Sequence, residues 1–143
     1  METLNKFSKL TFERQLRLLE AAFWHLGLRI GLKILPFAVL RGFLARGVPA
    51  KTAAVDEAMV RDVLRDSKVI SRRLPGAGCL ADAMATQMLL ARRGHTTRLR
   101  VGVRRIGDGE LGAHAWLERH GETVIGGVDS PRQFESVPLS SIS

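Results

Sequence analysis

The single cysteine, Cys79, is the side chain of this chain with the greatest capacity for covalent chemistry. It follows the glycine-rich segment 74–78 and opens a stretch whose apolar residues recur at helical spacing, so we expect it at a helix N-terminus. The unpaired N–H groups and the dipole of a helix N-terminus favour the nucleophilic thiolate, and they can also stabilise an oxyanion. The alternative is a buried cysteine that acts as a small hydrophobic residue.

A thiol nucleophile needs a general base, and His114 is the best-placed histidine for that role. It lies at the start of a predicted strand, and one other strand separates it from the helix of Cys79. Packing that helix across the sheet can bring the two side chains together. Trp116 would share the face of His114 and shield the pair from water. The remaining histidines fall in an N-terminal helix, a loop and a hairpin turn: His25, His95 and His120.

The sequence lacks the patterns expected for disulfides, metal sites and nucleic-acid binding. One cysteine excludes an internal disulfide and the zinc motifs built on paired cysteines, and the histidines lack HExxH spacing, so we expect no metal and no cofactor. Lysine and arginine number 22 against 14 acidic residues, a net charge of +8. The lysine and arginine residues are scattered along the chain, and aromatic residues make up only 6%. This distribution argues against nucleic-acid binding and favours an acidic peptide partner or a basic solvated surface.

The N-terminal region is apolar only in patches. Basic residues interrupt it before it reaches the roughly 18 apolar residues of a membrane span, so we expect no stable membrane insertion. The pattern of a secretory signal is also missing, and we expect a cytoplasmic protein.

The first predicted element is an amphipathic helix over Thr11–Ala45 that Pro36 ends or kinks near Ile34. Its apolar stripe consists of Phe12, Leu16, Leu19, Ala22, Phe23, Leu26 and Ile30. This stripe would either pack on the core or dock a membrane or another protein, and we favour packing.

Two further helices and a small sheet complete the prediction. The helices cover Val55–Ser67 and the segment from Cys79 to Gly94. Period-two alternation predicts antiparallel strands over residues 98–104, 113–119 and 123–127, with a tight turn at His120–Gly121. The tail after Pro131 would add a last strand or loop. We therefore predict an α+β protein with a helical extension over residues 1–50 and a catalytic domain over residues 51–143.

Four short motifs, taken in order along the chain, resemble a known family. They are Pro75-xxx-Cys79-Leu80, Arg92-Arg93-Gly94, Leu99-Arg100-Val101-Gly102-Val103 and Ala113-His114-Ala115-Trp116-Leu117-Glu118. Their order and spacing, over roughly residues 65–140, resemble the standalone transglutaminase-like leader peptidases of lasso-peptide biosynthesis, which are similar to the C-terminal domain of microcin-processing proteins.

The resemblance implies a transglutaminase-like, papain-like fold and a cysteine protease that removes the leader from a ribosomally made precursor peptide. A separate leader-recognition protein would present the precursor, and an ATP-dependent lasso cyclase would then join the freed amine to a side-chain carboxylate. The family uses a Cys, His, Asp triad, onto which Cys79 and His114 carry over. The aspartate does not carry over, because Gly126 occupies its position and Gly127 follows.

Asp129 is the nearby downstream carboxylate that could orient His114 instead. It would reach the imidazole only if the strand bends at the glycine pair; otherwise a backbone carbonyl or water would hold the ring. A two-residue turn would place Gly127 opposite His114, and a three-residue turn would place Gly126 there.

Two other functions stay open at this point. The same Cys–His pair could transfer an acyl group to an amine, because water and amines attack the same thioester. A catalytically silent scaffold that binds the precursor is the alternative from another class, and its support is the missing aspartate.

Overall fold

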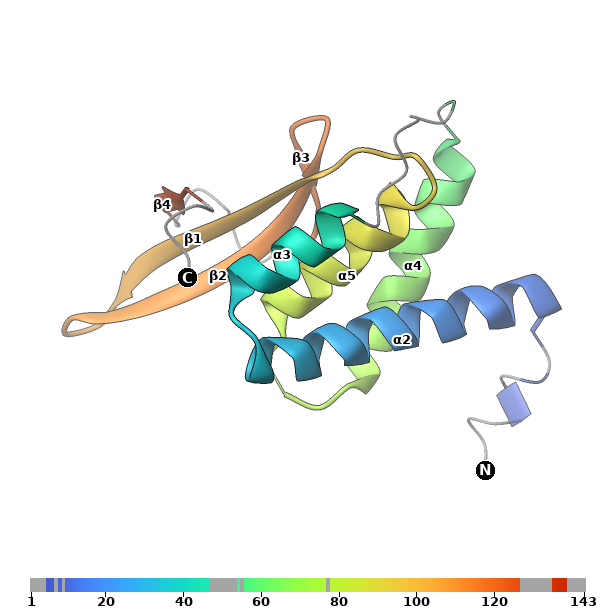
Figure 1. Cartoon of the computed structure of the whole chain (residues 1–143), viewed down its shortest axis with the longest axis horizontal. Helices are drawn as coiled ribbons and strands as arrows, with labels where there is room; N and C mark the ends of the chain where they lie inside the picture. Colours follow the sequence, from blue (N-terminus) through green and yellow to red (C-terminus); the bar gives the residue numbers. More distant parts are fainter. Residues whose placement is uncertain are drawn as a thin grey trace.

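In the computed structural model of this chain, the helices gather on one side of a small antiparallel sheet (Figure 1). The structure describes residues 5, 6, 8, 10–46, 54, 56–76, 78–126 and 135–138. The elements are α2 (Phe12–Ile34), α3 (Phe37–Arg46), α4 (Glu57–Arg73), α5 (Cys79–Ala91), β1 (Arg98–Ile106), β2 (Glu110–Arg119), β3 (Glu122–Ile125) and β4 (Glu135–Val137). The predicted α+β class is confirmed.

Helix α5 lies at the centre of this arrangement. It contacts α2 and α4 among the helices, and β1, β2 and β3 in the sheet. Its buried residues are small or apolar: Ala81, Ala83, Met84, Ala85, Thr86, Met88, Leu89 and Leu90. A helix that is apolar nearly all round must be covered on every side, so its neighbours hold its position and that of Cys79 at its start.

The break between α2 and α3 confirms the role predicted for Pro36. Helix α2 ends at Ile34, and Leu35 adopts an extended conformation, with φ −117° and ψ 146°. The proline ring disfavours helical geometry in the residue before it, so the chain turns here and restarts at Phe37.

The face of α2 that packs on the core is not the one expected from the sequence. Leu18, Ala21, His25 and Leu28 are buried, whereas the stripe predicted to pack is exposed, Phe12 by 71%. Exposed members of that stripe are Phe12, Leu16, Leu19, Phe23, Leu26 and Ile30. Both faces of α2 carry apolar residues, so periodicity alone could not identify the inner one. No helix in the described part of the chain is long and apolar enough to cross a bilayer.

Helix α4 is longer than predicted at its C-terminal end. Asp56 caps its start by accepting a hydrogen bond from the Met59 N–H at 3.0 Å. The helix then passes through Ser67 and ends at Arg73, just before Pro75. The predicted end at Ser67 is wrong because its hydroxyl hydrogen-bonds a side chain on another helix instead of competing for the backbone. Val55, the predicted start, lies outside the described residues.

The sheet has the strand order β3-β2-β1-β4. Strand β1 pairs with β2 along its whole length, and β4 pairs with the other edge of β1. The tail thus contributes a strand, one of the two alternatives predicted for it. The two-residue turn His120–Gly121 is confirmed: both residues have positive φ, 52° and 79°, which suits a tight hairpin.

The helices predicted as an N-terminal extension share one hydrophobic core with the rest of the chain. Leu28 of α2 and Leu40 of α3 belong to the same buried cluster as Met84 of α5 and Leu117 of β2. The predicted boundary at residue 50 lies outside the described residues and stays a prediction.

A buried polar network ties the first turn of α5 to α2 and α4. Asp82 accepts hydrogen bonds from Nδ1 of His25 at 2.9 Å and from the Ser71 hydroxyl at 2.5 Å. The Ser67 hydroxyl lies 3.3 Å from the other ring nitrogen of His25. His25 and Ser67 are fully buried, so this network satisfies polar groups that would otherwise destabilise the core.

Arg29 extends the network to the loop before α5. Its guanidinium contacts both oxygens of Asp82 at 3.1 Å and donates to the Pro75 and Gly76 carbonyls at 2.7 and 3.1 Å. A Cβ at Gly78 would lie 2.8 Å from this guanidinium, so a side chain there would require Arg29 to shift. Arg29 therefore holds the chain on both sides of the helix start.

Replacing Asp82 should reveal how strongly the fold depends on this network. Asp82→Asn removes the negative charge and replaces one acceptor oxygen by an NH2 donor that faces other donors, so we expect it to lower the free energy of unfolding by about 2 to 4 kcal/mol in urea denaturation. Asp62→Asn, a control in an exposed pair with Arg65, should cost less than about 1 kcal/mol. Equal effects of the two substitutions would contradict the structural role of the network.

The same variant should change how stability depends on pH. Burial raises the pKa of the Asp82 carboxyl, but hydrogen bonds from His25, Ser71 and Arg29 outweigh burial and hold this pKa below its usual 3.8. The carboxylate therefore stabilises the fold above pH 3.8, and this contribution is lost as the pH falls through the lowered value. The stability difference between parent and Asp82→Asn should shrink on acidification; a difference independent of pH would argue against an ionised Asp82.

Candidate active site

Cys79 is the first residue of α5, as the sequence predicted. Its thiol is free and half-buried. Gly78 is the N-cap and has no side chain with which to cap the helix, and its carbonyl accepts the Asp82 N–H at 2.7 Å. The sulfur is thus positioned where helix N–H groups and the dipole favour negative charge.

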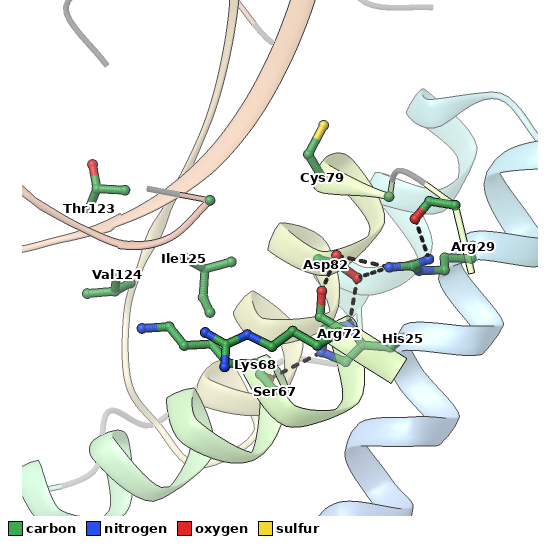
Figure 2. Close-up of a pocket in the computed structure, with 14 residues that line it drawn as sticks. His25, Arg29, Ser67, Lys68, Arg72, Cys79, Asp82, Thr123, Val124 and Ile125 are labelled. Atoms are coloured by element: carbon green, nitrogen blue, oxygen red, sulfur yellow. Dashed lines mark hydrogen bonds and ion pairs between the residues drawn. The ribbon is translucent and has the colours of Figure 1, made fainter. Parts of the chain in front are cut away.

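Cys79 lines a cleft of about 570 Å³, a size typical of small-molecule sites. Figure 2 shows Cys79 at one side of this cleft, with α4 and β3 forming other walls. The cleft is lined by His25, Arg29, Ser67, Lys68, Ser71, Arg72, Gly76, Gly78, Cys79, Asp82, Thr123, Val124, Ile125 and Gly126.

His114 is held in a defined orientation by the main chain. It lies on β2 opposite Gly102, and its Nε2 is 2.7 Å from the carbonyl oxygen of Gly126. A carbonyl can only accept, so Nε2 carries the proton in this contact. In the neutral imidazole, Nδ1 is then the atom that can take up a proton, which is the state a general base requires.

Trp116 packs against this imidazole as predicted. The two rings are stacked, with their centroids 6.2 Å apart and an angle of 18° between their planes. The indole is buried and donates to Glu118 at 2.9 Å, and Glu118 also pairs with Arg100. These contacts fix the ring on one side and restrict the access of water to it.

The bend that presents the Gly126 carbonyl differs from both registers considered from the sequence. Glu118 pairs with Thr123, but Leu117 pairs with Ile125, so a β-bulge at Val124 shifts the ladder. Gly126 then leaves the strand with φ +76°.

Gly126 also lies unusually close to the neighbouring strand. A Cβ at this position would lie 2.6 Å from the Ala115 carbonyl oxygen and 3.1 Å from the Trp116 Cα. Glycine is therefore required here for close backbone approach, and the position that lacks the expected carboxylate supplies a carbonyl instead.

His114 is not among the described residues that line the cleft of Cys79, and a hydrogen bond to Gly126 links it to that cleft. Cys79 and Gly126 line the same cleft, and Gly126 holds His114. Direct contact between the sulfur and the imidazole stays a prediction. Asp129 and Gly127 lie outside the described residues.

A second set of hydrogen bonds, Ser67–His25–Asp82, has the order found in serine hydrolases. Asp82 accepts from Nδ1 of His25, so Nε2 can accept from the Ser67 hydroxyl. Although Ser67 borders the cleft, it is fully buried, so its hydroxyl is not exposed to a substrate carbonyl in this structure. The accessible nucleophile in this region is Cys79, and the buried set has a structural role.

Asp82 and Arg29 were not identified from the sequence as part of this site. Their partners are distant along the chain, on α2, α4 and the loop before α5, so no local motif connects them. The available signals were an acidic residue in the first turn after Cys79 and a histidine inside an apolar helix. In the described part of the chain, His, Cys, Asp and Glu form no group that could hold a metal ion.

Comparison with known proteins gives the family of the chain. The family model described as the transglutaminase-like superfamily matches residues 22–138. Searches of the curated proteins and of the solved structures found no match. Since the matched region runs from α2 to the residue after β4 and takes in most of the chain, the protein belongs to the transglutaminase-like superfamily, whose members are generally cysteine proteases and transglutaminases.

Proposed function

We propose that this chain is a cytoplasmic cysteine peptidase that removes the leader from a ribosomally made lasso-peptide precursor. The peptidase activity is supported by one arrangement in the structure. Cys79 lies at the start of α5 and lines a cleft, and Gly126, which lines the same cleft, orients His114 through its carbonyl. Membership of the transglutaminase-like superfamily supports thiol-based acyl chemistry. The choice of a lasso precursor as substrate rests on the resemblance of the four motifs.

The proposed reaction follows from the placement of these groups. The Cys79 thiolate attacks the scissile carbonyl, and N–H groups at the start of α5 stabilise the resulting oxyanion. His114, having taken the thiol proton, gives it to the leaving amine, and the leader remains as a thioester on Cys79. Water, deprotonated by His114, then hydrolyses the thioester and releases the leader.

The alternative of a silent binding scaffold loses part of its support. It was based on the absence of an aspartate at Gly126, but the main-chain carbonyl at that position already binds the imidazole N–H. Acyl transfer to an amine uses the same first step and differs only in the attacking nucleophile. A leader-recognition protein and an ATP-dependent cyclase would complete the proposed pathway on either side of this reaction.

Cys79→Ala is the direct test of the nucleophile. We expect it to abolish release of the leader from a lasso-type precursor peptide, measured by mass spectrometry, because no other cysteine is present. The half-buried thiol is small, so the melting temperature should stay close to that of the parent. Leader release at the parental rate would exclude the proposed mechanism.

Gly126→Ala tests the orientation of His114. The added methyl group would meet the Ala115 carbonyl and move the Gly126 carbonyl away from the imidazole, so we expect kcat to fall by up to about 100-fold. Gly121→Ala is a matched control, because Gly121 has almost the same φ, +79°, but open space around it. An equal fall in kcat in both variants would indicate that backbone strain alone, and not displacement of the Gly126 carbonyl, causes the loss of activity.

Asp129→Asn tests the carboxylate that was proposed from the sequence. If Asp129 also orients His114, the substitution should lower kcat by orders of magnitude with little change in stability. Single-turnover assays with the precursor measure this rate. A rate within a few fold of the parent would instead assign the orientation to the Gly126 carbonyl and define the site as a Cys–His dyad.

A further inference from the structure

Two basic side chains, Lys68 and Arg72, line the same cleft as Cys79. They lie four residues apart on α4, so they project from the same face of that helix. Both are exposed. In Figure 2 they extend side by side from α4 toward the strand that carries Val124 and Ile125.

The positive charge of this pair is not neutralised within the described part of the chain. The ion pairs there involve neither Lys68 nor Arg72. Among the described residues that line the cleft, the one carboxylate is Asp82, and Arg29, His25 and Ser71 already occupy it. Like charges four residues apart on a helix repel each other, so an anion between them would be stabilised.

From this placement we infer that Lys68 and Arg72 form a subsite for a carboxylate of the peptide substrate. Arginine can bind a carboxylate through two parallel hydrogen bonds, and lysine adds a point charge. Thr123, Val124 and Ile125 on the opposite wall can contact the neighbouring part of the peptide. The favoured ligand is an aspartate or glutamate side chain close to the scissile bond. This inference deepens the proposed function and rests on Cys79 being the nucleophile.

Alkylation of the single cysteine can measure the charge of this subsite without any substrate. Iodoacetate and iodoacetamide both react with the thiolate of Cys79 and release iodide, but only iodoacetate is an anion. The rate with iodoacetate divided by the rate with iodoacetamide therefore reports local positive charge. Changes in the amount of thiolate cancel in this ratio, because they affect both rates equally. We expect this ratio to fall severalfold in the Lys68→Gln/Arg72→Gln double variant, and to fall in the parent as salt is added.

Arg73→Gln is the matched control, since Arg73 is the next residue of α4, is exposed and does not line the cleft. Its alkylation ratio should equal that of the parent. Both substituted positions of the double variant are exposed, and thermal melts should confirm that it folds. A ratio unchanged in the double variant, or lowered equally by Arg73→Gln, would overturn the inference.

Protection of Cys79 from iodoacetamide identifies the source of the carboxylate. Three short peptides serve as probes: a blocked peptide with Asp, the same peptide with Asn, and the Asn peptide with a free C-terminal carboxylate. Protection by the Asp peptide alone, lost in the double variant, would support a side-chain carboxylate, and protection by the free acid would assign the subsite to a chain terminus. Equal protection by all three would overturn carboxylate recognition, even if Cys79→Ala abolishes leader release; the two proposals can thus fail separately.

Discussion

The carboxylate of Asp82 lies where α2, α4 and α5 meet, and the geometry of the candidate site depends on the contacts that it makes there. Arg29 binds this carboxylate and the loop carbonyls at the same time, so the loop cannot move independently of the helix that follows it. A side chain at Gly78 would displace the Arg29 guanidinium. A reactive helix start needs an accurate position, and here a network under the helix supplies it.

The opposite wall of the cleft depends on backbone geometry. A bulge in β3 and the left-handed Gly126 turn a carbonyl toward His114, which keeps the proton on Nε2. A carbonyl can orient an imidazole as a carboxylate does, but it carries no full charge to stabilise an imidazolium. The site thus combines a helix start fixed by partly buried ion pairs with a histidine fixed by a bent strand, and the two come from different layers of the fold.

Much of this arrangement could be predicted from local sequence patterns. The glycine-rich segment followed by an apolar run placed Cys79 at a helix start, Pro36 ended α2, and His120–Gly121 formed the tight turn. The features that were predicted wrongly depend on contacts between residues distant in the sequence. Ser67 continues α4 because its hydroxyl bonds to a histidine of α2, and the inner face of α2 is decided by which apolar face α5 covers. The bend at Gly126 follows from a bulge that strand periodicity does not encode.

The central claim is that Cys79 carries the leader as a thioester during cleavage. Acid-quenched reactions with the precursor, analysed by intact-protein mass spectrometry, should show the chain with the leader acyl group attached to Cys79. Prior alkylation with iodoacetamide should remove both this adduct and leader release, because the chain has one cysteine. Release of the leader at an undiminished rate by the fully alkylated chain would contradict the account.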